Sequence, residues 1–144
     1  MTRPVALPPD LAATASLLID RIRAALPEVQ GVYAYGSRVR GGGHPASDLD
    51  LALLVPRQAR IAPLALLALR GDLELVAGCP VELAVLDPGR QLVHCKEVVA
   101  YSATLYVGDR RAVDDFEMRV LADYARLCEE RRPVIDAYGE TRRG

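Results

Sequence analysis

Two acidic side chains, Asp48 and Asp50, lie at the start of the most apolar stretch of this 144-residue chain, residues 49–55. In a β-strand, side chains two positions apart point to the same face, about 6.6 Å from each other. Two unpaired carboxylates there would repel each other and resist burial, so a bound cation explains them best. Hard oxygen ligands of this kind favour Mg²⁺, or Mn²⁺, over Zn²⁺.

A third carboxylate, Glu82, is the only charge within the apolar run 81–86. Neighbouring strands lie about 4.8 Å apart, so a strand formed by this run would bring Glu82 close to Asp48 and Asp50 if the two strands pair. Three converging acids are typical of metal-assisted nucleotidyl or phosphoryl transfer, in which two ions about 3.5–4 Å apart hold the attacking and leaving oxygens.

A glycine turn precedes these acids in the chain. Gly36-Ser37 follows a short apolar run and would open a short helix, whose free N–H groups and positive dipole end attract phosphate. Glycine lets a phosphate approach the backbone closely. Arg38 and Arg40, beside this turn, would supply fixed positive charge to a polyphosphate.

The remaining reactive residues and the overall charge exclude several classes of protein. Cys79, Cys95 and Cys128 are too widely spaced for a zinc knuckle and too few for a disulfide framework. We interpret His44 and His94 as solvent-exposed residues. The net charge of -1 argues against a dedicated nucleic-acid-binding protein, and the sequence contains neither a signal peptide nor a membrane span. We therefore expect a cytoplasmic protein with no membrane association.

The elements that must position these residues follow from hydrophobic periodicity and from Pro and Gly boundaries. We expect four longer helices, over residues 8–25, 61–76, 89–99 and about 110–132, and a short helix that opens at Ser37. We expect four strands, over residues 32–35, 49–55, 81–86 and 104–107. Residues 136–144 should form a polar, frayed tail. The run 49–55 reads as a central strand covered on both faces, and residues 104–107 as an edge strand. The pattern predicts one domain over residues 1–144, of α/β (α+β) class, with a small mixed sheet flanked by helices.

The segment GSRVRGGGHPASDLDLALLV resembles the minimal nucleotidyltransferase branch of the DNA polymerase β-like superfamily, whose usual pattern is GSxARG followed by SDxDL. Val39 replaces the usual Ala, and Glu82 stands where that branch more often has Asp. The final region, DFEMRVLADYARL, is similar to that of the MntA-type antitoxins within this branch.

This resemblance implies a polymerase β-like nucleotidyltransferase fold with ATP as substrate and two Mg²⁺ ions, or Mn²⁺ in their place. It also implies that Glu82 helps to deprotonate an incoming hydroxyl. The site residues that it implies are Asp48, Asp50 and Glu82 for metal binding and catalysis, and Gly36, Ser37, Arg38 and Arg40 for nucleotide binding.

The resemblance further implies a biological role. Such antitoxins bind a HEPN-domain ribonuclease toxin as a hetero-oligomer and neutralise it by transferring AMP from ATP to a tyrosine hydroxyl. Two alternatives stay open: an antitoxin that acts by binding and occlusion without catalysis, and a nucleotidyltransferase acting on a small molecule. The short chain favours an acceptor that is supplied by another protein.

Overall fold

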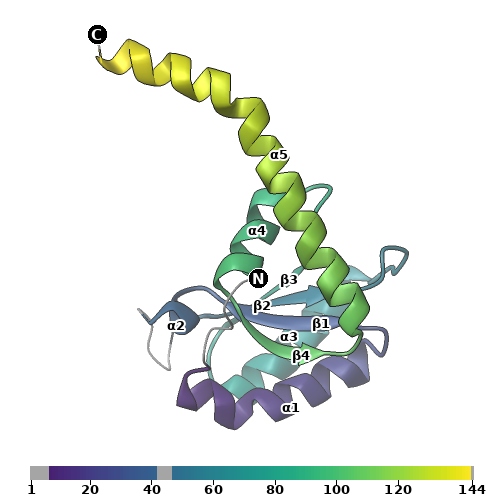
Figure 1. Ribbon diagram of the computed structural model, residues 1–144. Helices are drawn as coiled ribbons and strands as arrows, with labels where there is room; N and C mark the ends of the chain where they lie inside the picture. Colours follow the sequence, from purple (N-terminus) through teal and green to yellow (C-terminus); the bar gives the residue numbers. More distant parts are fainter. Residues whose placement is uncertain (1–6, 42–46, 144) are drawn as a thin grey trace.

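The computed structural model describes residues 7–41 and 47–143, with side chains up to residue 132. One four-stranded sheet carries helices on both of its faces (Figure 1). The elements are α1 (Pro9–Ala25), β1 (Gly31–Tyr35), α2 (Ser37–Arg40), β2 (Leu49–Leu54), α3 (Pro63–Ala77), β3 (Val81–Val85), α4 (Leu92–Tyr101), β4 (Ala103–Val107) and α5 (Arg110–Arg143). Their order is the predicted one.

The sheet is mixed, with strand order β3-β2-β1-β4. Strand β1 pairs antiparallel with both β2 and β4, whereas β2 and β3 are parallel. The parallel pair is possible because α3 provides the crossover from β2 to β3. The predictions of a small mixed sheet, a central strand at residues 49–55 and an edge strand at residues 104–107 are confirmed.

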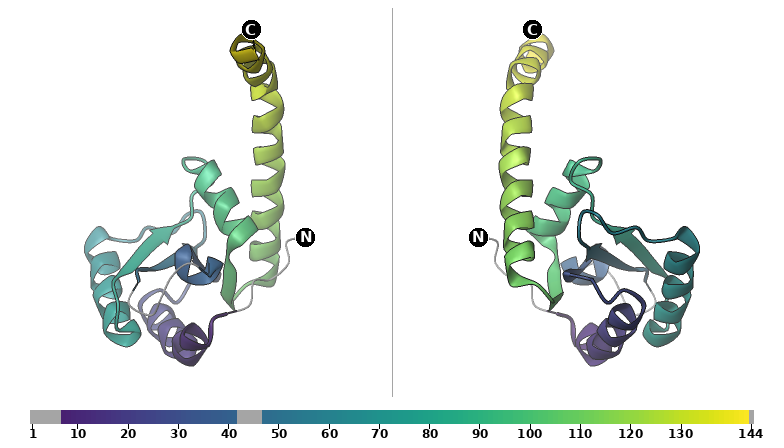
Figure 2. Two further views of the ribbon diagram at one scale, coloured as in Figure 1. Left: turned by 90° about the vertical axis from the view of Figure 1, so that its left-hand side faces the viewer. Right: turned by 90° about the vertical axis from the view of Figure 1, so that its right-hand side faces the viewer.

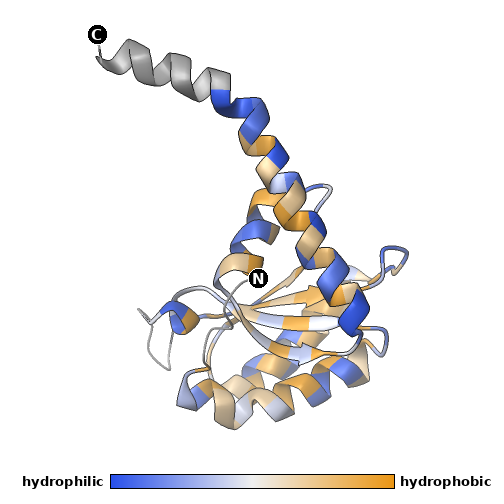
Figure 3. Cartoon of the chain, viewed as in Figure 1, coloured by the Kyte–Doolittle hydropathy of each residue, from blue (hydrophilic) through white to orange (hydrophobic). Residues whose placement is uncertain are grey.

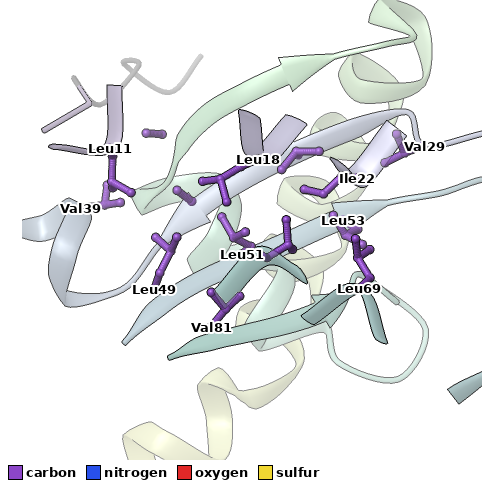
Figure 4. Packing of buried hydrophobic residues seen from close by; sticks show 14 of the residues in the cluster. Leu11, Leu18, Ile22, Val29, Val39, Leu49, Leu51, Leu53, Leu69 and Val81 are labelled. Carbon is purple, nitrogen blue, oxygen red and sulfur yellow. The ribbon is translucent and has the colours of Figure 1, made fainter. Parts of the chain in front are cut away.

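Helices α1 and α3 cover one face of the sheet and enclose an apolar core (Figure 4). Leu18 and Ile22 of α1, Leu73 of α3 and Leu51 of β2 are all fully buried in it. Burial of each such side chain contributes about 1.5–3 kcal/mol of transfer free energy, so this layer supplies much of the stability of the fold.

Helices α4 and α5 cover the other face, where the packing includes polar groups. Tyr33 of β1 packs its ring 6.4 Å from that of Phe116 on α5. The Tyr33 hydroxyl donates a hydrogen bond to Glu117 Oε1 at 3.2 Å. Burial, followed by the charge of Glu117, raises the pKa of Tyr33, and burial raises the pKa of Glu117. This bonded pair joins the sheet to the first half of α5.

The alternation along β2 assigns its side chains to the two faces. Leu49, Leu51 and Leu53 belong to the core under α1 and α3, whereas Ala52 and Leu54 belong to the core under α4 and α5. Asp50 alternates with the leucines, so its carboxylate points to the α4 side of the sheet.

The start of α4 differs from the prediction. We expected a helix from Gly89 with an Asp87-Pro88 start, but the helix begins at Leu92. The Asp87 carboxylate accepts a hydrogen bond from Gly89 N at 3.1 Å, and its carbonyl accepts one from Gln91 N at 2.8 Å. Asp87 therefore closes a turn that precedes the helix, because its side chain competes for the nearby backbone N–H groups.

The end of the chain also differs from the prediction. We expected the last helix to end before Pro133 and residues 136–144 to form a frayed tail, whereas α5 runs to Arg143 and extends well beyond the sheet (Figures 1 and 2). Proline removes one hydrogen bond and displaces the preceding turn, which kinks a helix without necessarily ending it.

The prediction for His44 lies outside the described residues. Within the described residues, no helix combines the length and the apolar character that crossing a membrane requires.

Candidate active site

Three polar side chains lie in one row across the sheet, on the face that α4 covers. The register pairs Tyr35 of β1 with Asp50 of β2, and Asp50 with Glu82 of β3. Directly paired residues of neighbouring strands point to the same face, so the phenol and the two carboxylates are neighbours. Asp48 lies two residues before Asp50, just ahead of β2, and its side chain is exposed. The strand register therefore places Glu82 beside Asp50, whereas Asp48 precedes β2 and is not part of that register.

The negative charges of this row act on one another. Partial burial raises the pKa of Asp50, and the carboxylates of Glu82 and Asp48 raise it further, while His94 opposes the effect. Burial also raises the pKa of Tyr35, with smaller contributions from Asp50 and Glu82. Both burial and neighbouring negative charges destabilise the ionised form of Asp50, so a bound cation would stabilise this carboxylate strongly.

Gly36 has the backbone that the turn beside Asp50 requires. Its φ is +82°, and a Cβ atom added there would lie 2.1 Å from Asp50 Oδ2. Any larger residue would therefore push the carboxylate out of place. The Gly36 carbonyl accepts hydrogen bonds from Val39 N and Arg40 N, which closes the single turn of α2. The amides that begin a helix have no intrahelical acceptor, and Ser37 is exposed beside them, so this turn is open to an anion.

Sequence reasoning missed His94. We predicted a solvent-exposed residue, but His94 is half-buried, and its Nε2 lies 3.2 Å from the Tyr35 hydroxyl. The two rings meet edge to face, with centroids 5.4 Å apart. His94 is in the first turn of α4, and the helix packing rather than any local pattern brings it to the row. The predicted helix over residues 89–99 already contained His94, but nothing in the local sequence indicated that this residue would pack against Tyr35.

Arg38 lies on the opposite side of the turn from the row of acids. It is only 7% exposed, forms an ion pair with Asp10 of α1, and donates a hydrogen bond to Cys79 Sγ at 2.9 Å. Hydrogen bonding to Arg38 holds the pKa of Asp10 below its usual range. These contacts fasten α2 to α1 and to the residues before β3, and the nucleotide contact of Arg38 stays a prediction.

Arg40 is more accessible. Its guanidinium lies 4.5 Å from the centre of the Tyr101 ring and 3.2 Å from Glu97 Oε2, with about half of the Arg40 side chain exposed. Together with Tyr35 and Gly36, these residues line a hollow of about 120 Å³ that adjoins the row of acids. A salt bridge so exposed to water is weak, so Arg40 can exchange its partner for a phosphate at little cost.

A larger cavity, of about 500 Å³, lies at the other end of the sheet, between the loop after β2 and α5. It contains none of the predicted site residues. Its lining mixes arginines with aspartates, among them Arg57, Arg119 and Asp123, and its size alone gives no reason to assign chemistry to it.

The donor set of the row fits a magnesium ion. Within the described residues, no group of three or more His, Cys, Asp and Glu side chains is arranged so that it could hold a metal ion by itself. Mg²⁺ in nucleotide-dependent enzymes is commonly held by one or two carboxylates together with substrate phosphates and water, so a complete protein cage is not required. Asp50 with Asp48 or Glu82 supplies that number of hard oxygen ligands.

Comparison with known proteins agrees with this geometry. The sequence profile of the nucleotidyltransferase domain family matches residues 16–104, which include every predicted site residue. The chain belongs to this family. Its members are nucleotidyltransferases, and the described fold is the polymerase β-like one that the sequence motif implies.

One similar protein and two similar solved structures make the comparison more specific. The chain is 27% identical over 119 residues to the protein adenylyltransferase MntA of Shewanella oneidensis, with 83% of each chain covered. A crystal structure of a toxin–antitoxin with AMP-PNP contains a chain that is 27% identical to this one, with a TM-score of 0.72 and coverage of 86% of this chain and 97% of that one. A tri-AMPylated Shewanella oneidensis HEPN toxin in complex with an MNT antitoxin is similar at 24% identity and a TM-score of 0.69, covering 88% and 97% of the two chains, which shows the fold alone.

Proposed function

We propose that this protein is an antitoxin that transfers AMP from Mg-ATP to a tyrosine hydroxyl of a HEPN-type ribonuclease toxin and thereby neutralises it. The observation that carries the proposal is the row of Asp50 and Glu82 beside the Gly36 turn, found in a chain similar to MntA and to the AMP-PNP-bound toxin–antitoxin. The similarity to a protein adenylyltransferase favours an acceptor on another protein.

Asp48, Asp50 and Glu82 are the residues that would hold divalent metal, with two Mg²⁺ ions as the preferred content and Mn²⁺ as a substitute. When bound, such ions neutralise phosphate charge and stabilise the attacking and leaving oxygens. Asp50 is the half-buried member of the set, and Asp48 and Glu82 are exposed on either side of it. This arrangement leaves the ions open to the nucleotide and to the acceptor.

Glu82 is best placed to receive the proton of the acceptor hydroxyl. It lies on an edge strand and is exposed, so an incoming side chain can reach it. In the reaction the hydroxyl oxygen bonds to the α-phosphorus, the bond from that phosphorus to the β-phosphate oxygen breaks, and pyrophosphate leaves with its electron pair. Glu82 takes the proton, as a general base within hydrogen-bond reach does.

The turn at Gly36 and Ser37 would bind the β- and γ-phosphates through backbone amides and the Ser37 hydroxyl. Of the two arginines, Arg40 is the direct phosphate ligand in this proposal, because its present ion pair is exposed and weak. Arg38 contributes by keeping the turn in place, since both of its partners lie away from the row of acids.

The proposed partners follow from the reaction. The protein acts as a hetero-oligomer with the toxin, uses cytoplasmic ATP, and has no need of nucleic acid or membrane. The double substitution Asp48→Asn/Asp50→Asn tests the proposal, with Asp20→Asn/Asp72→Asn on the exposed surfaces of α1 and α3 as the control. Each is incubated with Mg²⁺, ATP labelled at the α-phosphate, and the HEPN-type protein encoded beside it.

We expect label on the toxin with the wild type and the control, and none with Asp48→Asn/Asp50→Asn. Toxin that stays neutralised by Asp48→Asn/Asp50→Asn would replace the catalytic account with occlusion. Label that comes only from the γ-phosphate would make the protein a kinase, and label on an added small molecule but not on the toxin would favour the small-molecule enzyme.

A further inference from the structure

The apolar surface of α5 is wider than the part that packs on the sheet. Val113, Phe116 and Val120 are buried against the sheet and α4. A second line of residues on the helix is exposed: Met118, Leu121, Ala125 and Cys128, with Met118 72% exposed and Leu121 37% exposed. Figure 3 shows apolar residues along the stretch of α5 that rises from the fold.

The spacing of this line is that of a helix–helix contact. The steps from Met118 through Leu121 and Ala125 to Cys128 are three, four and three residues, the spacing of the a and d positions in a coiled coil. An α-helix is therefore the element that fits it. We call this line, with the charged residue one step beyond each end, the α5 stripe.

The two ends of the α5 stripe carry opposite charges. Asp114 lies four residues before Met118, and Arg132 lies four residues after Cys128. Each forms an ion pair within its own helix. Asp114 Oδ1 lies 3.9 Å from Arg110 Nη1, and Arg132 Nη1 lies 3.8 Å from Glu129 Oε1. Both of these ion pairs are largely exposed, so they contribute little and are easily exchanged for a better partner.

The α5 stripe is complementary to itself when two copies run antiparallel. The positions are symmetric about residue 123, so every residue of the stripe meets a different residue of the second copy. The facing pairs are Asp114 with Arg132, Met118 with Cys128, and Leu121 with Ala125. The first pair sets a negative charge against a positive one, and the other two set a larger apolar side chain against a smaller one. Two-fold symmetry makes each pair occur twice in the dimer.

We propose that α5 pairs with α5 of a second copy of this chain through this stripe, as a two-fold symmetric, antiparallel dimer. A two-fold interface requires that residue i contacts residue j and that j contacts i, and the stripe satisfies this at all six positions. A parallel pair would instead place Asp114 against Asp114 and Arg132 against Arg132, which repel. The contact extends over about 27 Å of helix, so the dimer is a weak one.

The projecting part of α5 gives a second reason for this pairing. The helix continues past the sheet, where no other described element packs on it (Figures 1 and 2). Isolated helices are only marginally stable in water, and packing of an apolar face normally stabilises them. The second copy supplies that packing for the upper part of the stripe.

Swapping the charges at positions 114 and 132 tests whether Asp114 of one copy lies against Arg132 of the other. Sedimentation equilibrium measures the dimer dissociation constant of the wild type, Arg132→Asp, Asp114→Arg/Arg132→Asp, and Arg126→Asp as a control on the exposed side of α5 away from the stripe. We expect Arg132→Asp to weaken the dimer at least about tenfold, since it places like charges together at both ends. The exchanged double variant should restore it, and Arg126→Asp should leave it unchanged.

A wild type that stays monomeric at every concentration would overturn the proposal. Equal weakening by Arg126→Asp and Arg132→Asp, or no restoration by the double variant, would overturn it as well. If the protein is monomeric and Arg132→Asp instead weakens binding of the toxin, the stripe is a toxin contact and the dimer is wrong. None of these results depends on AMP transfer, so the proposed function is tested separately.

A cysteine variant tests the antiparallel direction. Met118→Cys faces the exposed Cys128 of the second copy, whereas Cys79 and Cys95 are buried and unreactive controls within the chain. Under mild oxidation we expect a disulfide-linked dimer from Met118→Cys and none from Met118→Cys/Cys128→Ser. A linked dimer from the second variant would show residue 118 next to residue 118, which would overturn the antiparallel arrangement. Circular dichroism checks that both variants keep their helix content.

Discussion

The two faces of the sheet are built differently. Under α1 and α3 the core side chains are apolar, and Arg38, the one buried charge among the described residues, is paired with Asp10 at the edge of this core. Under α4 and α5 the same strands carry Tyr33 bonded to Glu117, and the row of Tyr35, Asp50 and Glu82.

This difference shows how a small domain carries a charged site without losing its fold. Strand β2 directs leucines to one face and Asp50 to the other, because alternate side chains point in opposite directions. The stability can come from the first face while the second tolerates groups that water or a ligand must solvate. Changes on the two faces should therefore separate stability from activity.

The largest effect should come from the apolar face. Leu51→Ala removes a fully buried side chain next to Asp50 in sequence but opposite to it across the sheet. We expect a loss of about 2–5 kcal/mol in the free energy of unfolding, because of lost burial and the cavity that remains. Denaturant unfolding measures it.

Leu75→Ala serves as the control, since Leu75 is 85% exposed on α3, and should change stability by less than about 0.5 kcal/mol. Below its unfolding transition, Leu51→Ala should keep the KM for ATP of the wild type. A large rise in that KM would mean that the two faces are not separable.

The next effect should come from the turn on the other face. Gly36→Ala would place a Cβ atom 2.1 Å from Asp50 Oδ2, so the carboxylate must move. A displacement of about 1 Å at a reacting centre can lower the rate about 100-fold, and we expect at least that loss in AMP transfer. Single-turnover kinetics measure it.

Gly41→Ala is the matched control. Gly41 also has a left-handed backbone, with φ +95°, but an added Cβ would meet nothing within 4 Å. Gly41→Ala carries the strain of a left-handed residue, about 1–2 kcal/mol, without moving a carboxylate, whereas Gly36→Ala combines strain at φ +82° and ψ -164° with the displacement of Asp50. Equal losses of activity in the two variants would show that strain rather than contact with Asp50 is responsible.

The sequence alone predicted much of this separation, and it failed where distant packing decides. The i, i+2 acids at the start of an apolar run predicted that Asp48 and Asp50 would share one face of a strand, and the charge within residues 81–86 predicted Glu82 close to them. Nothing local relates Arg38 to Asp10, which lies 28 residues earlier in the chain. The contact of His94 with Tyr35 depends on how α4 packs on the sheet. The start of α4 was missed because an Asp-Pro pair fits a turn as well as a helix start.

A smaller effect should come from the ion pair between Arg38 and Asp10 at the apolar face. Asp10→Asn removes the negative charge from this pair and leaves the Arg38 guanidinium with neutral acceptors only, the amide oxygen and Cys79 Sγ. Because the folded-state pKa of Asp10 is lowered from its ordinary value of 3.8, the ion pair stabilises the fold above that pH. The wild type should therefore be the more stable protein at neutral pH.

The difference between the two proteins should disappear in acid. As the pH falls through the lowered pKa of Asp10, the wild type loses the contribution that Asp10→Asn never had, and the two melting temperatures should converge. Thermal unfolding across this pH range measures it. A constant difference between the two proteins at all pH values would mean that the carboxylate charge is not what stabilises Arg38.

The smallest effect on stability should be a gain rather than a loss, and it comes from a substitution on the polar face. Asp50→Asn should raise the melting temperature slightly at neutral pH without metal or nucleotide. The folded-state pKa of Asp50 is raised, first by burial and then by Glu82 and Asp48, so its ionised form costs stability above that pKa. The gain should vanish as the pH falls below the ordinary carboxyl pKa of 3.8, where Asp50 is protonated in both the folded and unfolded states.

With Mg-ATP, the wild type should have a higher melting temperature than Asp50→Asn, the reverse of the order without ligand. A ligand that binds only the folded state raises its stability in proportion to the logarithm of its concentration over the dissociation constant, and Asp50→Asn should lose most of that gain. Thermal unfolding with and without Mg-ATP separates the two contributions. A variant that is less stable than the wild type without ligand would mean that the Asp50 carboxylate holds the Gly36 turn together. A variant that gains as much as the wild type from Mg-ATP would remove Asp50 from the site.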